Sequence, residues 1–405
     1  MTQSSASDPV NVKEGKLPRR DWILLPMLSL LTMALMAVST ESIARRLFSA
    51  SKTSLNSCLV LDDAATGVRG IPNSVCWEKT PESQLTEYRL DCLGFRTEMV
   101  CGPKPPGTYR IVMIGSSVAM GELVPIEKTL ATLLPKELSR STGRKVELYN
   151  EGMAFGFTRN TALRFNYVLA AKPDLILWVL TPIDVKLAGF LYAEYAETLS
   201  KRSDRASSFQ SGLLDSLKIT IRKYGGNPLA GTANALRHFF YEYESQNRYI
   251  QSYLNADEGF WDAGAGALRA ELSPEWEARL REFEVYAADV EEKARTAGIP
   301  LVAVLVPNRA QAAMISLNEW SVGFDPYRLD DEVRSIITRH GGTYIDILPD
   351  FRTLPNPERY YYPLDGHPDA RGHEVIAGFL ARELRGGAVS ELSAVQPYAA
   401  VEKVR

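Results

Sequence analysis

The sequence predicts an α/β protein built on a parallel sheet. Five short apolar runs are rich in Val, Ile and Leu, and each is bounded by Gly or Pro; they occupy 108–115, 145–152, 173–181, 299–307 and 342–348. Amphipathic stretches separate them, at Glu127–Ser139, Thr158–Ala171, Pro274–Ala297 and Asp330–His340. Continuous apolar strands that alternate with helices are typical of a parallel sheet covered on both faces. Ligands of such sheets bind at the carboxyl ends of the strands.

Length and charge limit the possible functions. The 405 residues are 45% hydrophobic, enough for one large domain with additions. The chain carries 46 Lys and Arg against 49 Asp and Glu, with no basic stripe. A nucleic-acid partner is therefore not expected. Small molecules, glycans or other proteins are the expected partners.

An uncharged apolar segment, Trp22–Val38, lies near the N-terminus and is just long enough to cross a thin hydrocarbon layer. Four basic residues precede it and favour a cytoplasmic N-terminus, although Arg45 and Arg46 after it weaken that bias. Two alternatives remain open. The segment is an uncleaved transmembrane anchor, which the long polar leader favours, or a signal peptide cut near Ala37–Ser39. Either one exports the remaining chain.

All the cysteines follow this segment closely: Cys58, Cys76, Cys92 and Cys101. An even, clustered set outside the cytoplasm predicts two disulfides, with three pairings possible. A zinc site is the rival, but no CxxC pair and no nearby histidine supports it. We expect disulfides and no metal.

These features divide the chain into segments. They are a cytoplasmic leader (1–21), a transmembrane anchor (22–40), a cysteine-containing lead-in (41–107), the first part of the α/β domain (108–200), a helical insertion (201–272), the second part of the domain (273–386) and a C-terminal tail (387–405). The insertion carries the aromatic run "ALRHFFYEYESQNRYIQSYL". Its aromatic residues are expected to form a packed small core, with a lid or a membrane-facing surface as alternatives.

A serine hydrolase requires a nucleophile and a histidine base, and the chain has four histidines. His238 lies in the aromatic insertion, His340 ends a helix before two glycines, and His373 falls in the first turn of the last helix. His367 remains, in the polar loop "YYYPLDGHPDARGH", with Asp365 two residues before it. Taken alone, this loop is equally an ordinary turn or the entrance to a helix. Ser117, in "RIVMIGSSVAMGE", follows the first strand, and by itself that segment indicates only a strand, a tight turn and the start of a helix.

Four blocks in order resemble the SGNH/GDSL hydrolase superfamily: "VMIGSSVAMG", "YNEGMAFGFT", "PDLILWVLTPID" and "DGHPDARGH". The resemblance covers roughly Tyr88 to Arg385, and the lead-in looks like that of membrane-associated bacterial members. It implies a flavodoxin-like three-layer α/β/α domain, with the N-terminal transmembrane helix and the helical insertion as additions. It also implies that Ser117 is the nucleophile, His367 the general base and Asp365 the carboxylate that orients it. The backbone N–H groups of Ser117 and Gly152 are the implied oxyanion donors, and no cofactor is implied.

Three positions depart from the family pattern. Ser116 replaces the usual aspartate before the nucleophile, and Ile183 stands where an oxyanion asparagine is usual, which leaves Thr181 or Asn160 as substitutes. The usual carboxylate stands three residues before the histidine, where this chain has Leu364. The closer Asp365 is similar to the spacing of bacterial polysaccharide acetyltransferases on this fold.

The expected function is that of an exported serine esterase that cleaves acyl esters through a covalent acyl-Ser117. The substrate class is an acylated glycan, such as an O-acetylated extracellular polysaccharide, or a small ester. Two alternatives remain: a polysaccharide O-acetyltransferase on the same site, and a non-catalytic glycan-binding or assembly protein that works with polysaccharide-assembly partners. The expected location is the bacterial inner membrane, with one transmembrane pass and a periplasmic domain.

Overall fold

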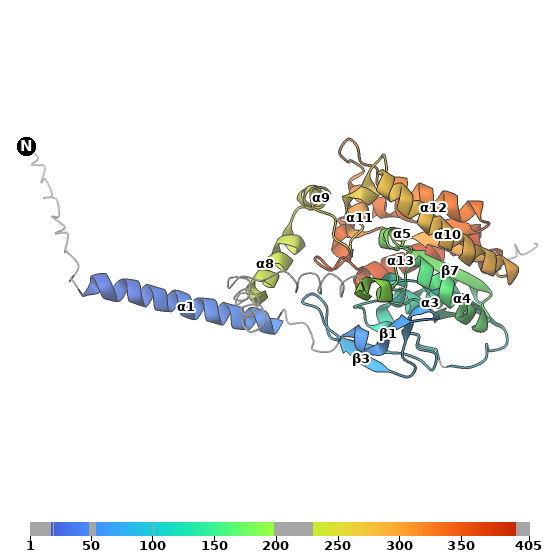
Figure 1. The fold of residues 1–405 in the computed structure, drawn as a ribbon, viewed down its shortest axis with the longest axis horizontal. Helices are drawn as coiled ribbons and strands as arrows, with labels where there is room; N and C mark the ends of the chain where they lie inside the picture. Colours follow the sequence, from blue (N-terminus) through green and yellow to red (C-terminus); the bar gives the residue numbers. More distant parts are fainter. Residues whose placement is uncertain (1–17, 19, 48–53, 100, 198–229, 394–405) are drawn as a thin grey trace, which may run out of the picture.

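The computed structural model describes residue 18 and residues 20–47, 54–99, 101–197 and 230–393 (Figure 1). Most of the predicted leader, the first part of the predicted insertion and most of the predicted C-terminal tail lie outside these residues.

The centre of the fold is a five-stranded sheet whose neighbouring strands are all parallel. Its order is β6-β5-β7-β8-β9. The strands are β5 (Thr108–Gly115), β6 (Lys145–Asn150), β7 (Leu175–Leu180), β8 (Leu301–Leu305) and β9 (Thr343–Ile345). Numbered along the chain, this is the 2-1-3-4-5 order of flavodoxin-like folds. The predicted fold class is confirmed.

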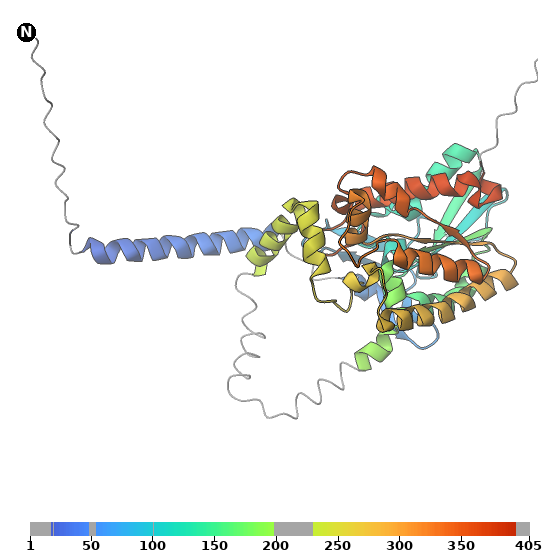
Figure 2. The same ribbon diagram turned by 90° about the horizontal axis from the view of Figure 1, so that it is seen from above.

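Helices cover both faces of the sheet because its strands are apolar on both sides (Figures 1 and 2). Val112 and Ile114 of β5 belong to one core, with α4, α10 and α12, while Ile111 and Met113 belong to the other, with α3 and α13. The helices of the α/β body are α2 (Ser117–Met120), α3 (Leu130–Thr142), α4 (Thr158–Ala170), α5 (Pro182–Lys186), α10 (Pro274–Thr296), α11 (Arg309–Leu317), α12 (Arg328–Arg339) and α13 (Ala370–Glu383).

The insertion contributes α8 (Ala230–Tyr243) and α9 (Gln246–Leu254). From α9, Tyr249, Ile250 and Leu254 are buried in a third core against α11. This agrees with the packed core expected of the insertion. The aromatic residues of α8 behave differently, because several of them are exposed.

The predicted anchor forms α1 (Asp21–Leu47), which is long and apolar enough to cross a membrane by length and composition. After it come two antiparallel hairpins, β1 (Leu59–Asp63) with β2 (Gly67–Gly70) and β3 (Val75–Glu78) with β4 (Thr86–Arg89). The predicted disulfides are present, and the pairing that the sequence left open is Cys58–Cys76 and Cys92–Cys101.

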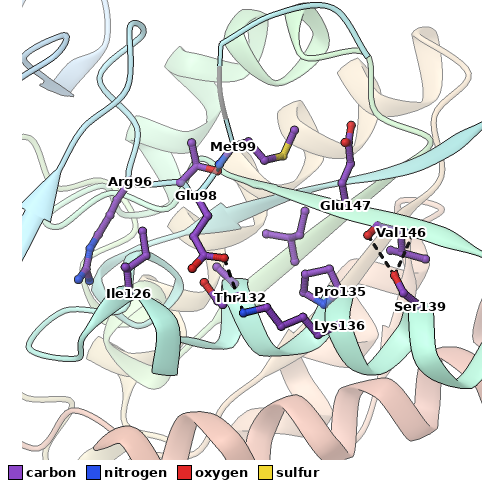
Figure 3. Close-up of a pocket in the computed structure, with 13 residues that line it drawn as sticks. Arg96, Glu98, Met99, Ile126, Thr132, Pro135, Lys136, Ser139, Val146 and Glu147 are labelled. Carbon is purple, nitrogen blue, oxygen red and sulfur yellow. Dashed lines mark hydrogen bonds and ion pairs between the residues drawn. The ribbon is translucent and has the colours of Figure 1, made fainter. Parts of the chain in front are cut away.

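The end of the lead-in packs beside the edge of the sheet and encloses a cavity of about 290 Å³ with α3 and β6 (Figure 3). Glu98 faces Lys136 across it, with 3.8 Å between the carboxylate and the ammonium group. Ser139 of α3 both donates to and accepts from the backbone of Val146. The first contact joins the lead-in to α3, and the second joins α3 to the edge strand β6.

The packed body extends beyond the predicted domain end at residue 386. Val389 and Leu392 are buried in the second core, together with Leu384. The first residues of the predicted tail are therefore part of the folded body.

Candidate active site

Ser117 lies at the carboxyl end of β5 and begins α2. The turn between them depends on Gly115, whose φ of 144° is in the region that favours glycine. A Cβ at this position would lie 2.3 Å from the carbonyl oxygen of Val179 on β7. Gly115 thus lets the two central strands approach each other next to Ser117.

The loop before α13 carries the predicted base to this serine. His367 Nε2 lies 2.7 Å from Ser117 Oγ, and His367 Nδ1 lies 2.6 Å from Asp365 Oδ1. With the Nδ1 proton donated to the carboxylate, Nε2 is free to accept the serine proton. The sequence separates Ser117 and His367 by 250 positions, so only the fold brings them together.

The contact between His367 and Asp365 shifts the pKa of both side chains. Burial by itself would lower the pKa of His367, but the charge and hydrogen bond of Asp365 outweigh it, and the pKa rises to about 9. The nearby carboxylates of Glu122 and Glu78 contribute to this rise. Burial would raise the pKa of Asp365, yet His367 holds it below its ordinary value. The site therefore strongly favours an imidazolium beside a carboxylate, the state that forms when the serine is deprotonated.

Two side chains of the lead-in hold the elements that carry the triad. The carboxylate of Glu82 accepts hydrogen bonds from the backbone N–H groups of Leu364 and Asp365, each at 2.9 Å. The buried guanidinium of Arg96 donates to carbonyl oxygens at the end of α2, among them that of Met120. The lead-in is thus part of the site's support.

Gly152, the predicted second oxyanion donor, lies directly against the helix of the nucleophile. A Cβ there would lie 2.5 Å from the amide nitrogen of Met120 and 2.6 Å from the carbonyl carbon of Ala119. In this structure, however, its N–H donates to the side chain of Asn150 at 2.9 Å. Close packing explains the glycine, and its role as an oxyanion donor stays a prediction.

Thr181 and Asn160, the expected substitutes for the oxyanion asparagine, both have other hydrogen-bond partners. Thr181 lines the cavity beside Ser117, but its hydroxyl donates to Asp184 Oδ2 at 2.6 Å in the capping box of α5. Asn160 does not line this cavity. Its amide accepts from the Val68 N–H of the lead-in and donates to the Phe190 carbonyl, so it joins α4 to β2.

The other histidines have structural contacts, as the sequence suggested. His373 is buried, its Nδ1 accepts from the Leu130 N–H, and burial lowers its pKa to about 3. His340 lies 3.2 Å from a carboxylate oxygen of Glu284. His238 of α8 lies 3.3 Å from Glu82. None of these three lies at the serine.

A cavity of about 530 Å³ opens over the triad. Ile183, the residue that the motif resemblance aligns with an asparagine, lines it. Asn308, at the amino end of α11, contributes an amide that donates to the hydroxyl of Tyr253. Much of the wall is aromatic: Tyr241, Tyr249, Tyr253, Phe260, Trp261 and Tyr361. An apolar, aromatic wall with a few polar groups is typical of a small-molecule site.

Sequence reasoning missed two cations that shape this cavity. The buried Arg309 donates to the carbonyl oxygens of Tyr241 and Pro363, and so joins α8 to the loop of the base. Lys186 donates to the carbonyl oxygens of Gly259 and Asp262, in the loop that carries the cavity's Phe260 and Trp261. Their positions just after β8 and β7 were the available signal, since that edge of the sheet binds ligands.

Within the residues that the structure describes, no group of three or more His, Cys, Asp or Glu side chains is arranged to hold a metal ion.

No family model and no curated protein matches the sequence. Among solved structures, TesA matches at 9% identity, covering 68% of this chain and 98% of its own, with a TM-score of 0.36. A lipase/acylhydrolase from Enterococcus faecalis matches at 14% identity, covering 69% and 96%, with a TM-score of 0.35. A putative arylesterase from Agrobacterium tumefaciens matches at 16% identity, covering 69% and 99%, with a TM-score of 0.32.

The ordered motifs, the strand order and the assembled Ser117–His367–Asp365 triad all agree with the resemblance to the SGNH hydrolases.

Proposed function

We propose that this protein is a serine ester hydrolase that forms an acyl intermediate on Ser117. One observation carries the proposal: a continuous chain of contacts runs from Ser117 Oγ to His367 Nε2 and from His367 Nδ1 to Asp365. His367 takes the serine proton as the hydroxyl attacks the ester carbonyl, and then gives it to the departing alcohol. Water repeats the sequence in the second half, releasing the acid and regenerating Ser117.

The finer proposal concerns the substrate and the location. An acyl ester on a glycan, with O-acetyl as the first candidate, suits the aromatic wall of the cavity, on whose flat rings a sugar face can pack. The apolar α1 and the disulfides of the lead-in support an exported protein tethered to the inner membrane, with the triad on the periplasmic side. A sugar hydroxyl in place of water would make the same site an acyltransferase.

A fluorophosphonate probe tests the proposal, because it reacts only with an activated serine. We expect labelling of the native chain, with hydrolysis of 4-nitrophenyl acetate, and loss of both in Ser117→Ala. The loss in kcat should be on the order of 10⁴-fold or more, as for removal of a triad nucleophile. Ser139→Ala is the matched control, since Ser139 lies in α3 and bonds to β6. A native chain that neither labels nor hydrolyses would overturn the proposal and favour a non-catalytic assembly protein.

A further inference from the structure

One side of α8 is an exposed apolar surface. Leu236, Phe239, Phe240 and Tyr243 are 52%, 55%, 61% and 70% exposed. They recur at the i, i+3, i+4, i+7 spacing that collects side chains on one side of a helix. We call these four residues the aromatic face of α8. The rings of Phe239 and Tyr243 contact each other, with 4.8 Å between their centroids.

α8 begins against the carboxyl end of α1 (Figures 1 and 2). The carboxylate of Glu41 on α1 accepts hydrogen bonds from the N–H groups of Gly231 and Thr232 and from the Thr232 hydroxyl, at 2.8 to 2.9 Å. Glu41 thereby satisfies donors of the first turn of α8. It follows the apolar run that ends at Val38 by about 4.5 Å along the helix axis. The first turn of α8 therefore lies next to the point where α1 would leave the hydrocarbon.

We propose that the aromatic face of α8 docks on the surface of the bilayer that α1 spans, at the boundary between the lipid headgroups and the acyl chains. The inference rests on the membrane tether of the proposed function. Amphipathic helices with aromatic residues on their apolar side bind at this boundary. Because α1 spans the bilayer and α8 begins against the end of α1, the bilayer surface is the partner that lies next to this face. Exposed cations on the same two helices, Arg46 on α1 and Arg237 on α8, suit anionic headgroups.

The other side of α8 connects this surface to the site. Tyr241 lines the catalytic cavity, and its carbonyl accepts from Arg309. His238 lies 3.3 Å from Glu82, the carboxylate that holds the backbone of Asp365. A helix docked on the bilayer would thus keep the cavity close to the membrane, where it meets esters carried by membrane-associated molecules.

Photocrosslinking of the full-length chain tests the docking. The chain is reconstituted in liposomes of phosphatidylcholine and phosphatidylglycerol, each carrying a clickable acyl chain, with benzoylphenylalanine at one position. Position 240 probes the aromatic face, and position 30 in α1 is the positive control. Position 285 is the negative control, because Val285 is 65% exposed on α10, in the α/β body. We expect lipid adducts at 30 and 240, and a yield at 285 at least tenfold lower.

The possible results distinguish a failure of the docking from a failure of the membrane tether or of the hydrolase activity. No lipid adduct at position 30 would overturn the tether and the docking together. Lipid adducts at 30 with only peptide crosslinks at 240, or with equal yields at 240 and 285, would overturn the docking alone. Hydrolysis of 4-nitrophenyl acetate by the same samples reports on the triad independently, because that ester needs no membrane.

A second variant keeps the inference testable if the probe at position 240 disturbs folding. With the probe at 243, Phe239→Gln together with Phe240→Gln removes two rings of the aromatic face, neither of which lines the cavity. We expect the lipid adduct to fall at least fivefold while aryl acetate hydrolysis stays within twofold. An unchanged lipid yield would contradict the docking.

Discussion

The two loops that present the triad are built in opposite ways. Ser117 follows the central strand β5, and the residues around it, Gly115 to Met120, are almost entirely buried. The loop of His367 is partly exposed, with the side chains of Asp365 and His367 28% and 23% exposed. The sheet holds the nucleophile, whereas side chains from distant parts of the chain hold the base.

These distant contacts come from several elements. Glu82 of the lead-in accepts from the loop's backbone, Arg309 donates to the carbonyl of Pro363, and the Tyr362 hydroxyl donates to the carbonyl of Leu123. Because the loop of His367 lies outside the sheet, its position can be changed without unfolding the sheet, whereas the position of Ser117 cannot. Variants of the loop and its supports should therefore act on rate more than on stability.

The largest effect on the base side is expected from Asp365→Asn. An amide cannot hold the imidazole in the tautomer that leaves Nε2 free, so kcat should fall by about 10⁴-fold. The melting temperature should change little, because the loop is partly exposed. Steady-state hydrolysis of aryl acetates and thermal unfolding measure the two quantities. Glu374→Gln, an exposed change on the adjoining α13, is the control and should keep native activity. A native rate in Asp365→Asn would show that the carboxylate has no role.

A smaller effect is expected from Glu82→Gln, which weakens the charge-assisted hydrogen bonds to the backbone N–H groups of Leu364 and Asp365 but leaves the three triad side chains in place. We expect kcat to fall about tenfold, which corresponds to an increase of about 1.4 kcal/mol in the activation free energy. KM for a small aryl ester should stay unchanged. Glu87→Gln, on the same lead-in but paired with Arg89, is the control. A change in KM alone, or equal effects in both variants, would assign Glu82 a different role.

The smallest effect is a shift in pH dependence. Glu122 raises the pKa of His367, and burial keeps its own pKa high, at about 7. The free enzyme is active when His367 is neutral, so kcat/KM should rise with pH towards about 9 in the native chain. In Glu122→Gln the midpoint should move to lower pH, by about one unit or less. Glu127→Gln, an exposed neighbour, should leave the profile in place. A midpoint that stays the same or moves upward would contradict the coupling.

The same raised pKa has a consequence for stability. The folded-state pKa of His367, about 9, lies above its ordinary value of 6.5. The protonated histidine therefore stabilises the fold fully below about pH 6.5, and this contribution is lost as the pH rises through about 9. Because the side chain is partly exposed, solvent screening makes the contribution small.

The sequence by itself determined the sheet, because a strand buried on both faces must be apolar throughout and the chain shows five such runs. The ordered motifs that resemble the SGNH hydrolases also predicted that Ser117, Asp365 and His367 act together, and the fold places them in contact. Cysteine clustering predicted the disulfides but not their pairing, since three pairings satisfy the same spacing.

The residues that support the site became visible only in the folded chain. Glu82, Arg96 and Arg309 are single charged residues with no local pattern, and their roles come from contacts with backbone far away in the sequence. The hydrogen bonds of Thr181 with Asp184 and of Asn160 with the lead-in were equally invisible in the sequence. Because of them, neither residue is free to donate to an oxyanion. Periodicity records which side of an element is buried, whereas a hydrogen bond across the fold depends on where two elements meet, and only the packed chain fixes that.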